Sequence, residues 1–400
     1  MQDIRISFEI NGSSFEASSL KNGEKSLEIC TCDGEIRVLV LYDYNEHPLE
    51  LKGNIELGDK VELVLLDYRI ELYVNGKIAD EEWPCGERLF ALGDELNLGE
   101  NAHISPYFDK KEELPCVISS FEDAEGWRPD DGSFVGDCMP YVKDGEYHVF
   151  YLKDRHHHKS KWGMGAHQWA HISTKDFKTW SVHPMAVEIT DKSEGSICTG
   201  SWIRKGGREY LYYTVRRAGL PALIRRSVSN DGYHFTKDES FCFTVSEKYD
   251  APSARDPKVF LGEDGLFHML LTTSLVKENR GCLAHYVSSD MEKWDECEKE
   301  MFVSPNHGQP ECPDYFKYNG KYYLVFTLPG KAQYMVSDKP FEGFAPPSDS
   351  GVECAGVPKG AIWNDRLIFV GFKAIDGYAG TMTFKAARAT RGGALIFEEL

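Results

Sequence analysis

The sequence has no apolar run that approaches the roughly twenty residues a helix needs to cross a bilayer. It also shows no secretory signal, because residues 1–8 alternate polar and apolar side chains and lack the basic stretch and apolar run of such a signal. Helix signals are scarce as well. These absences predict a globular, mainly β protein located in the cytoplasm.

Positive charge is also in short supply. The 45 Lys and Arg residues are outnumbered by 64 Asp and Glu residues, which leaves a net charge of −19. The acidic residues are spread along the chain, so the surface should repel phosphate backbones and anionic lipid headgroups. We therefore expect neither a nucleic-acid nor a membrane partner, and the sequence does not specify the oligomeric state.

The sequence lacks a clear set of metal ligands. Its 11 cysteines are odd in number and scattered, which favours a reducing compartment. Cys30 and Cys32 alternate on a predicted strand, but no second close pair completes a four-ligand set. Residues 155–159 read Arg-His-His-His-Lys, and neighbours on an extended chain point to opposite sides. We expect no metal and no cofactor, and His157 lies either in a solvated loop or in a rim loop that contacts substrate.

What the sequence does contain is a repeated hairpin. From about residue 117 onward, a turn of Asp, Asn or Gly precedes an aromatic-rich strand at intervals of about 45 to 62 residues. The five copies begin at Asp144, Gly206, Asp264, Asn319 and Asn364. A two-sheet sandwich is the alternative, but sandwiches do not repeat one hairpin with the same turn chemistry. We therefore predict an all-β fold with a five-bladed β-propeller over residues 117–400.

Residues 1–112 lack this repeat and predict a small β-sandwich. Their strands alternate in polarity and are separated by turns such as Asp33-Gly34 and Asn75-Gly76. Residues 70–77 predict a hairpin with a type I′ turn, and this segment resembles laminin-G or lectin-like jelly-roll domains. Such a domain either supports the propeller or binds sugar, and both interpretations remain open.

Two motifs carry the predicted chemistry. Arg-Asp-Pro at 255–257 and Glu-Cys-Pro at 311–313 each precede an aromatic-rich strand, and Asp137 precedes the first such strand. Glycoside cleavage needs two carboxyl groups, one to attack or activate water and one to protonate the departing oxygen. Because the inner strands of a propeller converge on one axis, Asp137, Asp256 and Glu311 can face a shared funnel.

These motifs, in their order and spacing, resemble those of glycoside hydrolase family 32, the fructoside-cleaving enzymes, over about residues 130–400. The resemblance implies that Asp137 is the nucleophile, Asp256 holds sugar hydroxyls and stabilises the transition state, and Glu311 is the acid/base. The candidate substrate-binding residues are Arg255, Trp162, Ser201, Thr199, His157 and Cys312; Trp162 can alternatively be a core aromatic. Residues 378–383 resemble the close of the family's propeller.

The sequence also departs from the family pattern. The family's Asn before the nucleophile is Gly136, its usual Phe is Cys198, and a usual glutamine is replaced by Leu152 or Lys153. The extra sandwich precedes the propeller rather than following it. These changes alter the sugar-binding end of the pocket and leave the acids in place.

We therefore expect a retaining glycoside hydrolase that acts on a fructose-containing disaccharide or oligosaccharide. One alternative is an inverting pentofuranosidase or xylosidase of the related five-bladed families, which lack the cysteine after the Glu, so Cys312 favours the first interpretation. Another is a non-catalytic saccharide-binding protein. A transferase with the same covalent intermediate remains a further alternative.

Overall fold

The computed structural model describes residues 3–12, 18–22, 25–41, 49–66, 69–83, 90, 95–97, 101–107, 117–120, 127–129, 132–155, 166–190, 194–216, 220–375 and 377–400. Apart from the 3-10 helix η1 (Ala251–Ser253), the regular elements in these ranges are β-strands, as the sequence predicts. No helix in the described ranges has the length and apolar character that crossing a bilayer requires.

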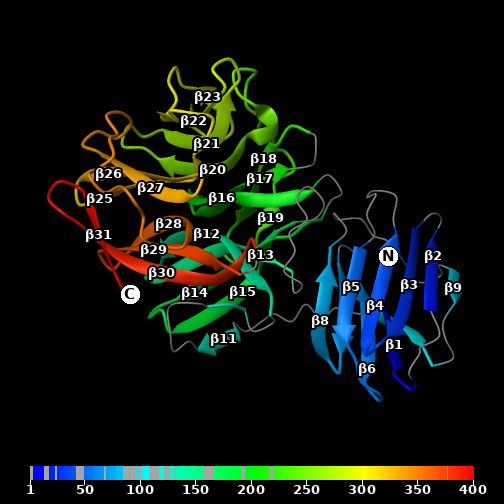
Figure 1. Ribbon diagram of the computed structural model, residues 1–400. Helices are drawn as coiled ribbons and strands as arrows, with labels where there is room; N and C mark the ends of the chain where they lie inside the picture. Colours follow the sequence, from blue (N-terminus) through cyan, green and yellow to red (C-terminus); the bar gives the residue numbers. More distant parts are fainter. Residues whose placement is uncertain are drawn as a thin grey trace.

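The amino-terminal strands form two five-stranded antiparallel sheets (Figure 1, blue to cyan). The first sheet has the order β10-β1-β6-β7-β8 and consists of β1 (Asp3–Glu9), β6 (Lys60–Leu65), β7 (Ile70–Val74), β8 (Lys77–Glu82) and β10 (His103–Tyr107). The second has the order β5-β4-β3-β2-β9 and consists of β2 (Ser18–Asn22), β3 (Lys25–Cys32), β4 (Glu35–Leu41), β5 (Leu49–Asn54) and β9 (Glu95–Asn97).

A single apolar core lies between these two sheets. Strands β1 and β4 alternate buried and more exposed residues, so each contributes one face to the core. Side chains from both sheets meet there, including Ile6, Leu63, Ile29 and Val38. At the β7–β8 turn Asn75 and Gly76 both have positive φ, 51° and 74°, which is the conformation of the predicted type I′ hairpin. The predicted sandwich is therefore present.

The remaining strands form four antiparallel sheets. The nine-stranded sheet holds both the first and the last of these strands, and dividing it between them gives five groups, which we call units 1 to 5 (Figure 1, green to red). Unit 1 contains β11 (Val117–Ser120), β12 (Phe134–Lys143), β13 (Glu146–Asp154), β14 (Gln168–Thr174) and β15 (Thr179–Val187). Unit 2 contains β16 (Ser196–Lys205), β17 (Arg208–Arg216), β18 (Leu223–Ser229) and β19 (Thr236–Lys237). Unit 3 contains β20 (Arg255–Leu261), β21 (Phe267–Leu275), β22 (Arg280–Ser288), β23 (Asp295–Glu296) and β24 (Phe302–Val303). Unit 4 contains β25 (Glu311–Tyr318), β26 (Lys321–Leu328) and β27 (Lys331–Ser337). Unit 5 contains β28 (Gly356–Trp363), β29 (Arg366–Ala374), β30 (Gly380–Ala389) and β31 (Leu395–Glu398).

The innermost strands of the units close a ring. Strands β12, β16, β20, β25 and β28 each contact the next, and β28 contacts β12 again. Units 1 and 5 are also joined by one residue pair, Val135 with Gly380. This arrangement is a β-propeller, as predicted, and the inner strands surround its axis.

The repeated turns have the conformation that their residue types require. In the turns Asp144-Gly145 and Asn319-Gly320 both residues have positive φ, so each of these turns joins its two strands as a type I′ turn. A second turn follows the third strand of a unit. There the Ser229 hydroxyl accepts a hydrogen bond from the Gly232 amide at 2.8 Å, and Ser288 does the same for the next unit. This second turn therefore recurs in units 2 and 3 with the same hydrogen bond.

Every inner strand carries a β-bulge close to its beginning. The register shifts fall between Val135 and Cys138, Ile197 and Gly200, Arg255 and Lys258, Glu311 and Asp314, and Gly356 and Lys359. A bulge leaves residues unpaired and turns their side chains away from the regular alternation. In three units the bulge includes a proline, which has no N–H to contribute to a ladder. The same local irregularity therefore occurs five times around the axis.

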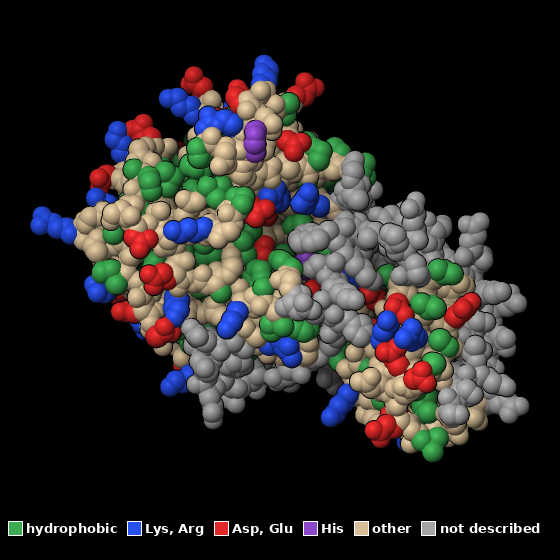
Figure 2. Space-filling model, viewed as in Figure 1, with side chains coloured by type: hydrophobic (Ala, Val, Ile, Leu, Met, Phe, Trp, Pro, Cys, Tyr) green, Lys and Arg blue, Asp and Glu red, His purple; other side chains and the backbone are tan. Residues whose placement is uncertain are grey.

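The sandwich contacts unit 1 through the end of β8. Glu82 Oε2 lies 3.0 Å from Arg155 Nε, and Glu81 Oε1 lies 3.2 Å from Lys153 Nζ. Trp83 packs in the same apolar cluster as side chains of units 1 and 2. The predicted domain boundary falls on residues 108–116, outside the described residues, so the division at 112 and 117 stays a prediction. Over the face seen in Figure 2, acidic and basic side chains are interspersed.

Candidate active site

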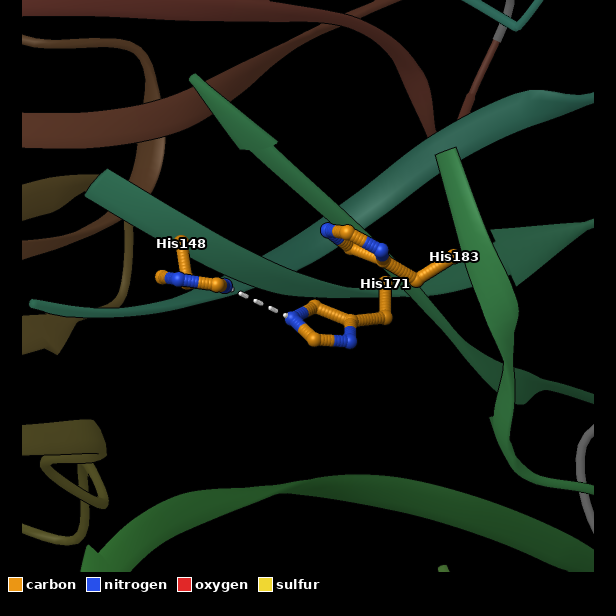
Figure 3. A group of neighbouring side chains, drawn as sticks. All are labelled: His148, His171 and His183. Atoms are coloured by element: carbon orange, nitrogen blue, oxygen red, sulfur yellow. Dashed lines mark hydrogen bonds between the residues drawn. The ribbon is translucent and has the colours of Figure 1, made fainter. Parts of the chain in front are cut away.

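A cluster of three histidines is the first polar group to consider as a functional site. His148, His171 and His183 lie on neighbouring strands of unit 1, and their potential ligand nitrogens are within 4.8 Å of one another (Figure 3). His148 Nδ1 and His171 Nε2 are 3.1 Å apart and face each other, as in a hydrogen bond. Unit 3 repeats this pair with His268 and His285 at 2.8 Å.

The recurrence of the histidine pair favours a structural role. Burial lowers the pKa of His148 to about 3 and that of His183 to about 4, so both rings are neutral near pH 7. Two neutral imidazoles can share one proton between their nitrogens, whereas a metal needs lone pairs that converge on one point. We therefore interpret the cluster as packing between propeller strands.

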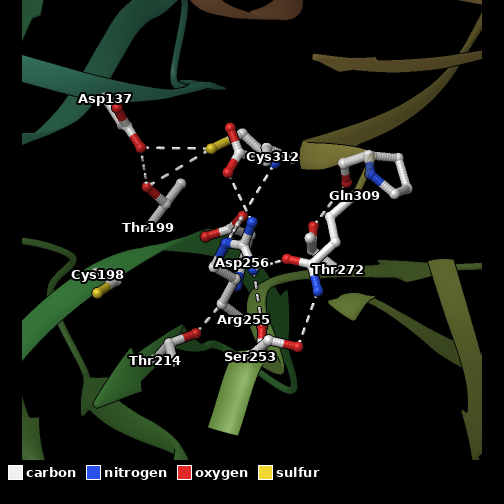
Figure 4. A network of polar contacts seen from close by, with 12 residues as sticks. Asp137, Cys198, Thr199, Thr214, Ser253, Arg255, Asp256, Thr272, Gln309 and Cys312 are labelled. Atoms are coloured by element: carbon white, nitrogen blue, oxygen red, sulfur yellow. Dashed lines mark hydrogen bonds and ion pairs between the residues drawn. The ribbon is translucent and has the colours of Figure 1, made fainter. Parts of the chain in front are cut away.

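The second group lines a cavity of about 1010 Å³ at the propeller axis. All five bulges contribute to its wall, through Asp137, Thr199, Asp256, Cys312 and Val357. Three of these residues come from the sequence motifs, and Figure 4 shows that their side chains gather in one network. The bulges thus bring residues from distant parts of the sequence to one place.

Asp137 is the acid that unit 1 contributes to the described lining of this cavity, and 8% of its surface is exposed. Thr199 Oγ1 and Cys312 Sγ donate hydrogen bonds to Asp137 Oδ2, the thiol from 3.3 Å, and the Tyr378 hydroxyl donates to Oδ1 from 2.9 Å. Burial raises the pKa of Asp137, and the charge of Asp256 adds to this effect, while the three donors act in the opposite direction. The donors therefore favour the ionised carboxylate against the cost of burial.

Asp256 is held by its own backbone and by that of Cys312. The residue has a positive φ of 59°, and its amide donates to Thr214 Oγ1 at 3.0 Å. Its Oδ2 accepts a hydrogen bond of 3.0 Å from the Cys312 amide. Cys312 also has positive φ, 51°. An L-residue in this conformation is strained and persists only where its surroundings hold it. The hydrogen bonds of the acid network therefore help to hold the bulges that place the acids.

Arg255 connects two of the acids. Its Nη2 donates to Glu311 Oε1 at 2.6 Å, and its Nε lies 3.6 Å from Asp256 Oδ2. Its Nη1 donates to Gln309 Oε1 at 2.6 Å and to the Ser253 carbonyl at 2.8 Å. Burial alone would lower the pKa of Arg255, but the two carboxylates hold it above its ordinary value. The side chain of Glu311 remains 47% exposed, facing the cavity while it is tethered by this guanidinium.

Cys312 links the two aspartates. Its amide bonds Asp256 and its thiol bonds Asp137, so one residue touches both carboxylates. Burial, and after it the charges of Asp137 and Asp256, raises the pKa of the Cys312 thiol well above its ordinary value. The thiol therefore keeps its proton and can serve as a donor.

The structure brings together most of the site residues predicted from the sequence. Asp137, Asp256, Glu311, Arg255, Thr199 and Cys312 all line the cavity. Trp162 and His157 lie outside the described residues.

Ser201 differs from this set. Its hydroxyl donates to the Pro257 carbonyl at 2.7 Å and accepts from the Val259 amide at 2.8 Å. It therefore joins units 2 and 3 and is absent from the described cavity lining. Because the bulge lies between Ile197 and Gly200, the side chain of Thr199 points to the cavity while that of Ser201 points to unit 3.

Sequence reasoning did not assign three further residues to the site. Tyr378 and Gln309 bond the acid network directly. Tyr378 begins the segment 378–383, and Gln309 stands two residues before Glu-Cys-Pro. Of the two candidates for the missing glutamine, Leu152 lines the cavity, whereas Lys153 bonds Glu81 of the sandwich. Only the alternation of side chains along β13 could have shown that Leu152 and not Lys153 faces the cavity. Which residues of β13 face the cavity depends in turn on the bulge in the neighbouring strand β12.

Comparisons with known proteins agree with the motifs. The family described as Glycosyl hydrolases family 32 N-terminal domain matches residues 137–342. The sucrose-6-phosphate hydrolase of Escherichia coli is 27% identical over 217 residues, which cover 51% of this chain and 42% of that protein. A probable sucrose-6-phosphate hydrolase of Psychromonas ingrahamii is 30% identical over 261 residues, which cover 61% of this chain and 44% of that protein. The chain thus spans less than half the length of these two relatives.

Two solved structures support the fold. The fructan 1-exohydrolase IIa of Cichorium intybus superposes with a TM-score of 0.57 at 19% identity, over 69% of this chain and 60% of that one. A family 43 β-xylosidase/α-arabinofuranosidase from a compost metagenome superposes with a TM-score of 0.52 at 16% identity, over 71% of this chain and 98% of that one. The family 32 match covers just over half of the 400 residues and includes all three motif acids. The chain therefore belongs to glycosyl hydrolase family 32.

Proposed function

We propose that this protein is a retaining glycoside hydrolase that cleaves a fructose-containing disaccharide or oligosaccharide. The observation that carries the proposal is the convergence of Asp137, Asp256 and Glu311, from three inner-strand bulges, on one cavity. Relatives named sucrose-6-phosphate hydrolase and β-fructofuranosidase support the substrate class.

In the proposed mechanism Asp137 attacks the anomeric carbon of the fructosyl ring. Its carboxylate forms an ester bond to that carbon while the glycosidic bond breaks, and Glu311 gives its proton to the departing oxygen. In the second step Glu311 takes a proton from water, whose oxygen displaces Asp137. The exposure of Glu311 suits a group that exchanges protons with leaving groups and water, and the enclosure of Asp137 suits a group that meets only the ring carbon.

Asp256 has a different proposed role. It would accept hydrogen bonds from sugar hydroxyls, and these bonds strengthen as positive charge develops on the ring. Arg255 holds Glu311 and approaches Asp256, so it keeps the acids in a fixed relation. Thr199 and Cys312 would position the Asp137 carboxylate from the side of Oδ2.

The main alternative is inverting hydrolysis of a pentofuranoside or xyloside. The family 43 β-xylosidase/α-arabinofuranosidase shares the fold over 98% of its length, so the fold itself does not separate the two reactions. Proton NMR of the first-formed anomer separates the two, since a retaining enzyme releases the substrate's own configuration and an inverting one the opposite. The assay should offer sucrose, its 6-phosphate, 1-kestose, inulin and aryl pentofuranosides.

The roles of the acids can be tested with Asp137→Ala and Glu311→Ala. Each should lower turnover by at least about 1000-fold on sucrose-like substrates. An aryl fructoside, whose leaving group needs no protonation, should restore the first step in Glu311→Ala and not in Asp137→Ala. Glu353→Ala is a matched control, because this exposed carboxylate also lines the cavity. Equal rescue of both variants, or full activity in both, would contradict the assignment, whereas saccharide binding without turnover by the wild-type protein would favour the saccharide-binding alternative.

We also propose that residues 1–112 and 117–400 are two domains, with the sandwich supporting the propeller. The buried pair of Arg155 and Glu82 supports this role over that of a separate sugar-binding module. A cytoplasmic location remains part of the proposal, supported by nine free cysteines among the described residues.

A further inference from the structure

The flank of Asp137 is where the chain departs from its family, because Gly136 stands in place of the usual Asn. The neighbouring space is filled by Tyr378, which precedes β30 and lines the cavity. The Tyr378 ring packs against Phe372 with centroids 5.2 Å apart, and against His167 at 4.9 Å. Its position is therefore fixed by contacts from two sides.

A single hydroxyl of Tyr378 makes two bonds to Asp137. It donates to Oδ1 at 2.9 Å and accepts from the Asp137 backbone amide at 3.1 Å. The other carboxylate oxygen is bonded by Thr199 and Cys312. Both oxygens of Asp137 are thus held, and the bond to the amide ties the carboxylate to the bulge that carries it.

Gly136 and Tyr378 depend on each other. A Cβ atom at position 136 would lie 2.4 Å from the Tyr378 hydroxyl oxygen and 2.8 Å from the ring carbon that bears it. Real Cβ atoms do not approach other heavy atoms so closely, so any side chain at this position would displace the phenol. The absence of a side chain at 136 is what admits the tyrosine to the nucleophile.

We propose that Tyr378 is the positioning residue for Asp137 in this protein, and that Gly136 and Tyr378 together take the place of the Asn that precedes the nucleophile in the family. This inference rests on the proposed function, in which Asp137 is the nucleophile. Tyr378 acts on the reaction through Asp137, by fixing the direction of Oδ1 and by favouring the ionised form.

The phenol is suited to remain a donor. Burial, and next the charge of Asp137, raises the pKa of Tyr378 well above its ordinary value, so its proton stays in place through the neutral range. The bond that it donates acts against the burial that raises the pKa of Asp137. Removing the hydroxyl should therefore raise the pKa of Asp137 further, and the active, ionised fraction should appear only at higher pH.

The test compares Tyr378→Phe with the matched control Tyr147→Phe. Tyr147 is also a buried tyrosine of the propeller, but its hydroxyl donates to the Ile368 carbonyl at 3.0 Å. For Tyr378→Phe we expect kcat/KM at neutral pH to fall roughly 10- to 100-fold, the range for a lost bond to a charged group. The fall should lie mostly in kcat, and the acid limb of the pH profile should move to higher pH. Tyr147→Phe should keep both kcat and the limb.

A carboxyl-carbon NMR titration of Asp137 in the free protein provides a readout that needs no turnover. The Asp137 pKa should rise in Tyr378→Phe, and also in Gly136→Ala, which displaces the phenol without removing it. Unchanged titration of Asp137 in both variants, or an acid limb that does not move, would overturn the inference. Wild-type protein that cleaves none of the tested glycosides would instead refute the proposed function, and the titration would still decide the role of Tyr378.

Discussion

Replacing the buried Arg155 with Met should lower the free energy of unfolding by about 3 to 5 kcal/mol, the cost of breaking one side of a buried ion pair. Arg155 is 0% exposed, and its Nε lies 3.0 Å from Glu82 Oε2. Its guanidinium also stacks 4.3 Å from the centroid of the Trp83 ring. Arg155→Met would remove this ion-pair partner from Glu82, whose residue is only 3% exposed, so water has little access to replace the lost contact.

The double variant Arg155→Met/Glu82→Leu should recover much of this loss, because removing both charges also removes their desolvation cost. Urea unfolding monitored by tryptophan fluorescence and circular dichroism measures each variant and the coupling between them. Lys339→Met is the matched control, since its ion pair with Glu342 is 2.6 Å long but about two-thirds exposed on both sides. That control should cost less than about 1 kcal/mol. If Arg155→Met costs no more than the control, the pair does not anchor the sandwich to the propeller.

Three further outcomes follow from the contacts described above. Cys312→Ala should move the acid limb of kcat/KM to higher pH, because the thiol bond lowers the pKa of Asp137. Cys312→Ser should stay closer to wild type, and an identical pH profile for all three proteins would show that Cys312 does not position the nucleophile. Ser201→Ala should cost about 1 to 3 kcal/mol of stability in urea unfolding, because two buried backbone groups lose their hydrogen bonds. An increase in KM without loss of stability would instead assign Ser201 to substrate binding. Gly320→Ala should cost about 1 kcal/mol of stability because Gly320 has a φ of 77°. Gly392→Ala should cost less, since Gly392 has an ordinary φ and the added carbon would lie 4.0 Å from its nearest neighbour; equal thermal midpoints of the two variants would contradict the turn assignment.

The features that local sequence could predict are those that local chemistry decides. Asn75-Gly76 and Asn319-Gly320 require positive φ at both positions, and the structure has it. The propeller followed from the repetition of such turns, and the place of Asp256 and Glu311 at the cavity followed from two short motifs. In these cases the residues that carry the signal also make the structure.

The features that the sequence concealed depend on contacts between distant segments. Tyr378 meets Asp137 across 241 positions of the chain, and nothing near either residue announces the contact. Thr199 and Ser201 stand two residues apart, which in a regular strand would place them on the same face. The bulge sends one to the cavity and the other to the neighbouring unit. A register shift of this kind changes every assignment made from alternation.

The five bulges also bear on how such a pocket can change over time. Each one presents a side chain to the same space, but hydrogen bonds link the residues at four of them, so a change at one of these four disturbs the others. Four of them carry Asp, Thr, Asp and Cys, while the fifth carries Val357, an apolar residue held at a φ of 43° beside Pro358. New chemistry can thus enter by one substitution at the fifth position, without rebuilding the other four.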